Sequence, residues 1–201
     1  MAKKPEYNTK NSLKDLQVEY GKVPPQAVDL EEALLGALML ERDAFSAVGD
    51  LLEPDAFYKD AHQRIFRAIH KLFLNDDPVD LLTVSEALKQ SGELEQVGGY
   101  YYLSQLTSRV ASAAHIEFHA KIIVQKYLQR KLIGICTDLQ TLAYDESTDV
   151  SDLMDKAQKS IFDLADGNIK KDTAEIAPII EAAIKGIQDA AKKPDGISGV
   201  P

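Results

Sequence analysis

The segment from His115 to Tyr144 restricts the possible folds more than any other part of the sequence, because it predicts one uninterrupted helix. It contains no proline and only one glycine, Gly134. A helix of about 30 residues is about 45 Å long. Apolar residues recur along it at steps of four, four, three, four and three, which is close to the spacing of a coiled-coil seam. These residues are Val124, Leu128, Leu132, Ile135, Leu139 and Leu142.

A second helix is predicted directly after the polar segment YDESTD. Its apolar residues step by three, four, four and three, and they are Val150, Leu153, Ala157, Ile161 and Leu164. Two long helices joined by a short polar loop form an antiparallel hairpin, which we assign to residues 113–166. A two-helix hairpin cannot bury so long a seam by itself, so we expect the hairpin of another copy to pack against it. The side chains expected at these contacts are Leu128, Leu132, Ile135, Leu139, Leu153 and Ile161.

Shorter helices precede the hairpin, and no strand pattern of period two persists anywhere in the sequence. Residues 1–21 are polar and predict a flexible tail, and residues 22–112 predict a small orthogonal bundle. Gly36 lies inside a leucine-rich helical segment, where it costs about 1 kcal/mol relative to alanine, so we expect another helix to cross closely there. Thr83 and Glu86 have the spacing of a capping box at the start of a helix. The predicted fold class is therefore all-α.

The last part of the chain predicts a linker that contains one isolated helix. Residues 167–193 begin with the polar stretch GNIKKDT and continue into PIIEAAIKGIQDAAKK, with Pro178 at a plausible first helical position. One face of this helix is apolar, and we expect it to dock on a neighbouring subunit; its residues are Ile176, Ile180, Ile184 and Ile187. Residues 194–201 look like the entrance to a further domain.

Composition excludes several classes of protein. The net charge of −9 argues against a domain that binds nucleic acid by itself, because phosphate neutralisation needs clustered Lys and Arg. No apolar run approaches the roughly 18 residues of a membrane span, and the N-terminal residues lack the apolar stretch expected of a signal peptide. The single cysteine, Cys136, rules out an internal disulfide and fits a reducing cytoplasm. Cys136 lies beside the apolar seam, so we expect it to be a buried small hydrophobe.

The sequence predicts no catalytic, cofactor-binding or metal-binding residue in this chain. None of its 11 glycines begins the motif G-x-x-x-x-G-K-[ST] with which a P-loop holds ATP phosphates. His115 and His119 have a spacing that can share one metal ion, but the segment HIEFH lacks the glutamate of H-E-x-x-H and no later histidine supplies a third ligand. We therefore expect no ATPase activity from this chain alone.

Several motifs nevertheless give the chain a specific resemblance. The segments VPPQAVDLEEALLGALML, FYKDAHQRIFRAIHKLF, PVDLLTVSEAL, GELEQVGGYYYLSQL and GISGVP occur in this order between Val23 and Pro201. They resemble the N-terminal region of bacterial replicative helicases of the DnaB family. The resemblance implies a collar on a hexameric ring, in which hairpins pair between subunits as a trimer of dimers. It also implies that residues 194–201 lead into a RecA-like motor, which would bind ATP and Mg²⁺ and unwind DNA.

The partners that the resemblance implies are other copies of the chain, primase and a helicase loader, with DNA contacted mainly by the motor and no membrane. Primase contact is expected near the tip of the hairpin, at residues 141–152. One alternative is a DNA-contacting domain that uses basic residues of the long helix, namely Lys121, Lys126, Arg130 and Lys131. Another is a self-standing helical scaffold that ends at Pro201.

Overall fold

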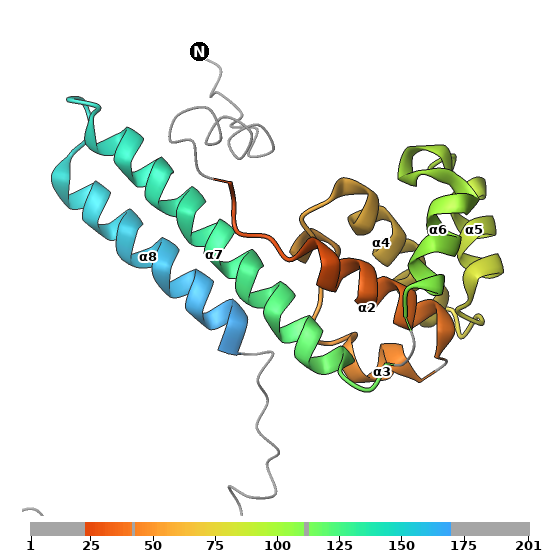
Figure 1. Ribbon diagram of the computed structural model, residues 1–201. Coiled ribbons are helices and arrows are strands. Elements are labelled where there is room, and N and C mark those ends of the chain that lie inside the picture. The colour runs from red at the N-terminus through yellow and green to blue at the C-terminus, as the bar shows by residue number, and fades with distance from the viewer. Residues whose placement is uncertain (1–22, 42, 111–112, 170–201) are drawn as a thin grey trace, which may run out of the picture. The chain divides into compact units, whose positions relative to one another are not determined.

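The computed structural model describes residues 23–41, 43–110 and 113–169, and in these ranges all regular structure is helical (Figure 1). The elements are α2 (Val28–Leu40), α3 (Ala44–Val48), the 3₁₀ turn η1 (Pro54–Ala56), α4 (Asp60–Leu74), α5 (Leu81–Gln90), the 3₁₀ turn η2 (Glu95–Val97), α6 (Gly99–Ser108), α7 (Ile116–Ala143) and α8 (Val150–Ile169). The all-α class is confirmed. The tail at 1–21 and the linker helix with Ile176, Ile180, Ile184 and Ile187 lie outside the described residues.

The chain divides into two units at Leu164 and Ala165, and the description that follows concerns the first. Its core surrounds α2, which packs against α4, α6 and α7. Leucines at positions 34, 35 and 38 of α2 are completely or almost completely buried. They share one core cluster with phenylalanines and isoleucines of α3, α4 and the first half of α7, and with Phe57 directly after η1. Burial of each such side chain contributes roughly 1.5–3 kcal/mol.

Gly36 allows α2 and α6 to cross at close range. A Cβ atom at this position would lie 2.2 Å from the backbone carbonyl oxygen of Leu106 in α6. Because that oxygen belongs to a helix backbone, it cannot move aside as a flexible side chain would. The expected close crossing is confirmed, and it explains why a glycine is accepted in the middle of a buried helix.

The start of α5 differs from the prediction, which was wrong about the residues of the capping box. The helix begins at Leu81, so Thr83 is its third residue and Asp80 is the N-cap. The Asp80 carboxylate accepts hydrogen bonds from the backbone N–H groups of Leu82 (2.8 Å) and Thr83 (2.9 Å). The Thr83 hydroxyl accepts one in return from the N–H of Asp80 (2.9 Å). Thr83 thus takes the place that the prediction gave to Glu86.

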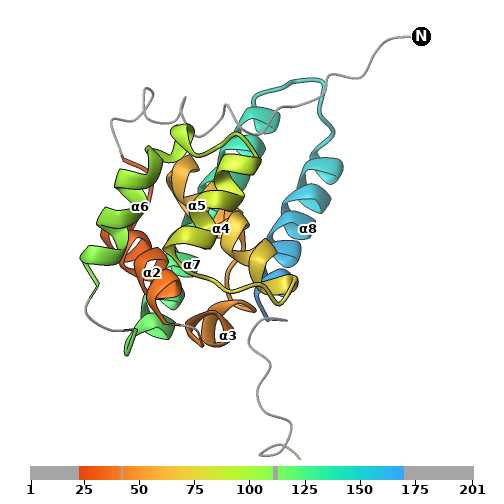
Figure 2. The ribbon, with the colours of Figure 1, turned by 90° about the vertical axis from the view of Figure 1, so that its right-hand side faces the viewer.

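Helix α7 belongs both to the bundle and to the hairpin. Its first half places Ile116, Ala120 and Ile123 in the core, and Arg130 is the last of its residues to be buried. Beyond Arg130 the helix continues to Ala143, and α8 returns beside it in the opposite direction (Figures 1 and 2). The predicted antiparallel hairpin is confirmed.

Candidate interaction surface

The two helices of the hairpin face each other through apolar side chains that remain only half-buried. On α7 these include Leu128, Ile135 and Leu139, and on α8 they include Leu153. No side chain between Val150 and Asp166 of α8 is fully buried. By helical position these side chains face the companion helix, and their half-burial leaves much of the apolar surface of the hairpin in water, as expected for two helices without a third layer.

A second strip of α7 is exposed and carries no charge. Its residues follow one another at steps of three or four, so they share one face of the helix over about 38 Å. They are Phe118, Ile122, Gln125, Gln129, Leu132, Cys136, Gln140 and Ala143, and all except the half-buried Ile122 are exposed. We call these eight residues the α7 strip. Phe118 keeps 64% of its surface exposed and Leu132 keeps 44%.

Helix α8 has a matching strip of exposed, uncharged residues. Its members are Val150, Met154, Gln158 and Ile161, which are again three or four positions apart. Met154 and Ile161 leave 65% and 53% of their surfaces exposed. We call these four residues the α8 strip. The charged residues of α8 between positions 152 and 163 lie on its other faces.

Both strips lie on the same side of the hairpin. On each helix, the strip lies about a quarter of a turn around the helix axis from the apolar side chains that face the companion helix. Viewed from the N-terminus of each helix, this rotation has the same direction in α7 and in α8. Because the two helices run in opposite directions, a rotation in the same direction on each places both strips on the same side of the hairpin. The bundle contacts α7 from the opposite side, through Ile116, Ala120 and Ile123. The combined surface, which we call the open side, is therefore clear of the bundle.

The structure separates the six predicted contact residues into two groups. Leu132 and Ile161 lie on the open side, whereas the others face the companion helix of their own hairpin by helical position: Leu128, Ile135, Leu139 and Leu153. The expectation that Cys136 is buried was wrong, since its thiol is exposed. Sequence reasoning followed the coiled-coil seam and missed Phe118 and Met154. The absence of charge at every third or fourth position was the signal that could have found them.

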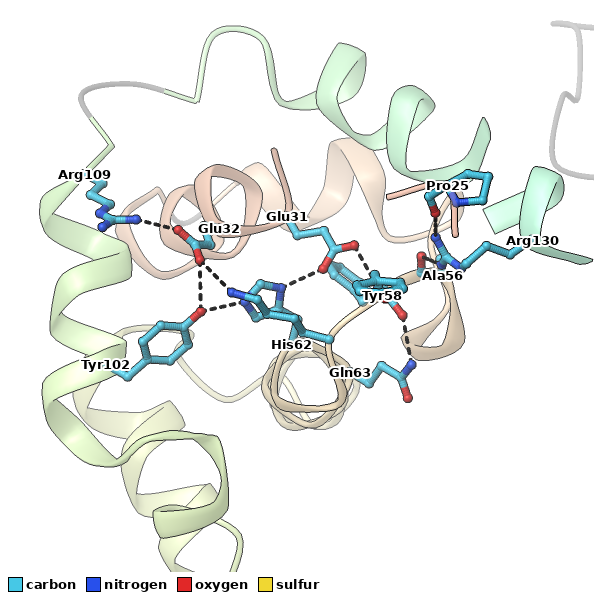
Figure 3. A network of polar contacts seen from close by, with 12 residues as sticks. Pro25, Glu31, Glu32, Ala56, Tyr58, His62, Gln63, Tyr102, Arg109 and Arg130 are labelled. Carbon is cyan, nitrogen blue, oxygen red and sulfur yellow. Dashed lines mark hydrogen bonds and ion pairs between the residues drawn. The ribbon is translucent and has the colours of Figure 1, made fainter. Parts of the chain in front are cut away.

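Arg130 anchors the hairpin to the bundle. Its guanidinium donates hydrogen bonds to the backbone carbonyls of Pro25 (2.9 Å) and Ala56 (2.6 Å), as Figure 3 shows. The same group lies over the rings of Tyr58 and Tyr127, at 5.7 and 5.8 Å from their centroids. Burial lowers the pKa of Arg130, while the nearby carboxylate of Glu31 acts in the opposite direction.

These contacts make Arg130 unavailable to DNA, which corrects its place among the possible DNA-contacting residues. The guanidinium of Arg130 is buried and donates its hydrogen bonds inside the protein, to the backbone carbonyls of Pro25 and Ala56. Of the other three, Lys131 lies over the Tyr127 ring at 5.3 Å, and Lys126 donates to Gln129 at 3.4 Å. The basic residues therefore do not form one exposed row.

The described residues hold no group of three or more His, Cys, Asp or Glu side chains that could bind a metal ion. His115 is exposed and His119 is half-buried at the start of α7. Among the helices described here, none is long and apolar enough to cross a membrane. The open side of the hairpin, by contrast, carries the exposed apolar side chains of Phe118, Leu132, Met154 and Ile161.

Comparison with known proteins matches residues 23–125 to the model of the DnaB-like helicase N terminal domain. The chain belongs to this family. The match ends at Gln125, within α7, and it covers the bundle together with the beginning of the hairpin. The family assignment therefore rests on the bundle.

Longer similarities extend through the hairpin. The chain is 44% identical over 193 residues to the replicative DNA helicase DnaB of Rhodothermus marinus, covering 96% of this chain and 20% of that protein. It is 33% identical over 180 residues to the replicative DNA helicase DnaC of Bacillus subtilis, covering 90% of this chain and 40% of that protein. The chain thus spans less than half the length of these relatives.

Solved structures share the fold. The N-terminal domain of DnaB helicase from Mycobacterium tuberculosis is 37% identical, with a TM-score of 0.66, over 70% of this chain and 99% of that one. A DnaB-like replicative helicase whose structure describes its interactions with primase has a TM-score of 0.63 at 21% identity. It covers 87% of this chain and 37% of that one. At that identity the second similarity concerns the fold alone.

Proposed function

We propose that this chain is the collar and linker part of a replicative DNA helicase, where it assembles subunits and receives primase. The observation that carries the proposal is the open side of the hairpin, an exposed surface without charge on two long helices. Membership of the DnaB-like helicase N-terminal domain family supports it. So do the relatives named as replicative DNA helicases, which are longer than this chain.

Assembly would begin with two copies that pair through their open sides. The strips of α7 and α8 are about 38 and 17 Å long and each helix is about 10 Å wide, so a pair would bury on the order of 1,000 Å² in total. That is the lower end of specific protein interfaces, so the pair should form in a concentration-dependent manner. Three such pairs would build a trimer of dimers, and hence a hexamer.

The remaining parts of the family function would lie outside the described residues. The linker helix would dock on a neighbouring subunit through Ile176, Ile180, Ile184 and Ile187. A motor domain would bind ATP and Mg²⁺, contact DNA and unwind it, and this chain alone would have no such activity. The whole protein would work in the cytoplasm without a membrane contact, with a helicase loader as a further partner.

Primase would bind the collar near the tip of the hairpin, at residues 141–152. Support comes from the similar fold of a DnaB-like replicative helicase whose structure describes its interactions with primase. The turn at the tip is ordered by Asp145, which accepts hydrogen bonds from the backbone N–H and the hydroxyl of Ser147 at 2.9 and 2.7 Å. These bonds lower the pKa of Asp145.

Cys136 provides a direct test of pairing, because it lies on the α7 strip and is the only cysteine of the chain. We expect light scattering to show a mass that rises from monomer to dimer as concentration rises through the micromolar range. Modification of the Cys136 thiol should slow over the same range. A chain that stays monomeric at high micromolar concentration, with a thiol that reacts equally fast throughout, would refute the pairing.

A further inference from the structure

Four ionisable side chains are buried in the described part of the chain: Glu31, Glu32, His62 and Arg130. With a neutral His62 these four groups carry a net charge of −1, and a proton on His62 brings them to zero. Lys59 and Arg109 also pair with Glu32, but they reach it from the surface, where water and salt screen their charges. The charge of His62 therefore decides the electrostatic balance of this interior.

His62 lies in the middle of a chain of polar contacts that joins three helices (Figure 3). Its Nδ1 atom is 2.7 Å from Oε2 of Glu31 in α2. Its Nε2 atom is 2.7 Å from the hydroxyl oxygen of Tyr102 in α6, and this hydroxyl is 3.3 Å from Oε1 of Glu32. The other oxygen of Glu31 accepts the backbone N–H of Tyr58 at 2.7 Å. A carboxylate, an imidazole, a phenol and a second carboxylate thus follow one another.

The number of protons in this chain decides which contacts are hydrogen bonds. Three contacts need three protons, but a neutral imidazole has one N–H and a phenol has one O–H. Burial and the charge of Glu32 raise the pKa of Tyr102 to about 12, so its hydroxyl keeps its proton near neutrality. With a neutral His62, Nδ1–H donates to Glu31 and the Tyr102 hydroxyl donates to Nε2. The 3.3 Å contact between Tyr102 and Glu32 then has no proton of its own.

A protonated His62 changes this arrangement. The imidazolium donates from both nitrogens, to Glu31 and to the oxygen of Tyr102. The phenolic proton becomes free to point at Glu32, and all three contacts are then hydrogen bonds. Each of the three then has a charged donor or a charged acceptor, and such bonds are stronger than neutral ones.

We propose that His62 and Tyr102 form a proton-dependent switch, in which proton uptake by His62 turns the Tyr102 hydroxyl from Nε2 of His62 to Oε1 of Glu32. The switch changes the link between α6 and α2. Its electrostatic surroundings are Glu31 and Glu32 from α2, Lys59 before α4, Arg109 after α6 and Arg130 from α7. Because Arg130 is attracted to Glu31, the charge of His62 also bears on the residue that anchors the hairpin.

Nuclear magnetic resonance of the full chain, with ¹⁵N-labelled histidine and ¹³C-labelled tyrosine, tests the switch directly. The signals of His62 are assigned by their loss in His62→Gln. At alkaline pH we expect a proton on Nδ1 and none on Nε2, and at acidic pH a proton on both. The Cζ signal of Tyr102 should change with the same midpoint. A neutral form that carries its proton on Nε2, a Tyr102 signal independent of His62, or a His62 that keeps one charge from about pH 5 to 9 would each overturn the proposal.

A matched pair of variants gives a second test. Tyr102→Phe removes the hydroxyl of the switch, and Tyr101→Phe removes a hydroxyl from a neighbour that is 74% exposed. Tyr102→Phe should lower the thermal midpoint more at about pH 5.5 than at about pH 8.5, because the charged state uses the hydroxyl twice. Tyr101→Phe should lower the thermal midpoint only slightly, and by a similar amount at the two pH values. Equal losses for Tyr102→Phe at the two pH values contradict the switch, and if that variant does not fold, the resonance experiment on the unmutated protein decides.

Discussion

Replacement of Leu132 by aspartate should abolish pairing of the hairpin while leaving the monomer folded. Leu132 keeps 44% of its surface exposed, so a monomer loses little when the side chain becomes polar. Complete burial of a leucine contributes roughly 1.5–3 kcal/mol, so burial of the exposed part contributes about 0.7–1.3 kcal/mol per copy. A two-fold axis doubles this to about 1.3–2.6 kcal/mol.

The aspartate adds a larger penalty, because each copy would bring an unpaired carboxylate into the interface. Such burial costs several kcal/mol or keeps the interface open. The total loss should therefore reach at least about 4 kcal/mol, which corresponds to roughly a thousandfold weaker dimer. Light scattering and sedimentation over a concentration series measure the change, and circular dichroism with thermal melting reports whether the monomer remains folded.

Two companion variants separate the possible outcomes. Thr141→Asp changes the net charge by the same amount at an exposed position of α7 outside the strip, and it should leave pairing nearly unchanged. Ile135→Asp changes a half-buried residue that faces α8, so it should lower helicity and the melting temperature as well. The reasoning fails if Leu132→Asp still forms dimers, or if Leu132→Asp and Thr141→Asp weaken them equally.

Three further outcomes concern the bundle. Gly36→Ala should destabilise it by roughly 1–3 kcal/mol in chemical denaturation, because the new Cβ meets the Leu106 carbonyl; unchanged stability would mean that α2 and α6 can separate freely. Asp80→Ala should lower the free energy of unfolding by about 0.5–2 kcal/mol because α5 loses its N-cap, whereas Glu86→Ala should change it little. Equal effects of the two substitutions would support the capping box predicted from sequence, with Thr83 and Glu86. Burial raises the pKa of Glu32, but Lys59, the Tyr102 hydroxyl and Arg109 together outweigh this effect, so the pKa lies below its ordinary value of 4.5. The ionised Glu32 should thus contribute fully to stability above about pH 4.5, and this contribution should disappear as the pH falls through the lowered pKa of the folded protein. A Glu32→Gln variant whose stability falls with acid in the same way as that of the unmutated protein would contradict this.

The helices of this fold could be predicted from the sequence, because a helix depends on the local periodicity of apolar residues. The segment from His115 to Tyr144 predicted the helix that the structure places at Ile116–Ala143, and the heptad-like spacing predicted its companion. Gly36 predicted a close helix crossing, because a glycine in a buried helix needs a steric reason. These inferences needed only residues within a few turns of one another.

Three of the missed features depend on contacts between distant parts of the chain. Arg130 was grouped with surface lysines, yet its partners Pro25 and Ala56 lie 105 and 74 positions away. His62 had no visible partner in the sequence, and Tyr102, 40 positions later, provides one. The exposure of Cys136 depended on which side of α7 the bundle occupies. Local patterns do not contain this information.

The course of α7 has a mechanical consequence. The bundle holds this helix up to Arg130, and one turn later stands Gly134, whose Cα has open space around it where a side chain would be. No steric demand explains a glycine there, and glycine weakens a helix interior because its backbone has more conformational freedom than that of any other residue. From Gly134 to Ala143 the helix rises about 13 Å, so a bend of about 10° would carry the far end sideways by about 2 Å. A bend at Gly134 would therefore leave the anchored first part of α7 in place and move the tip of the hairpin farthest.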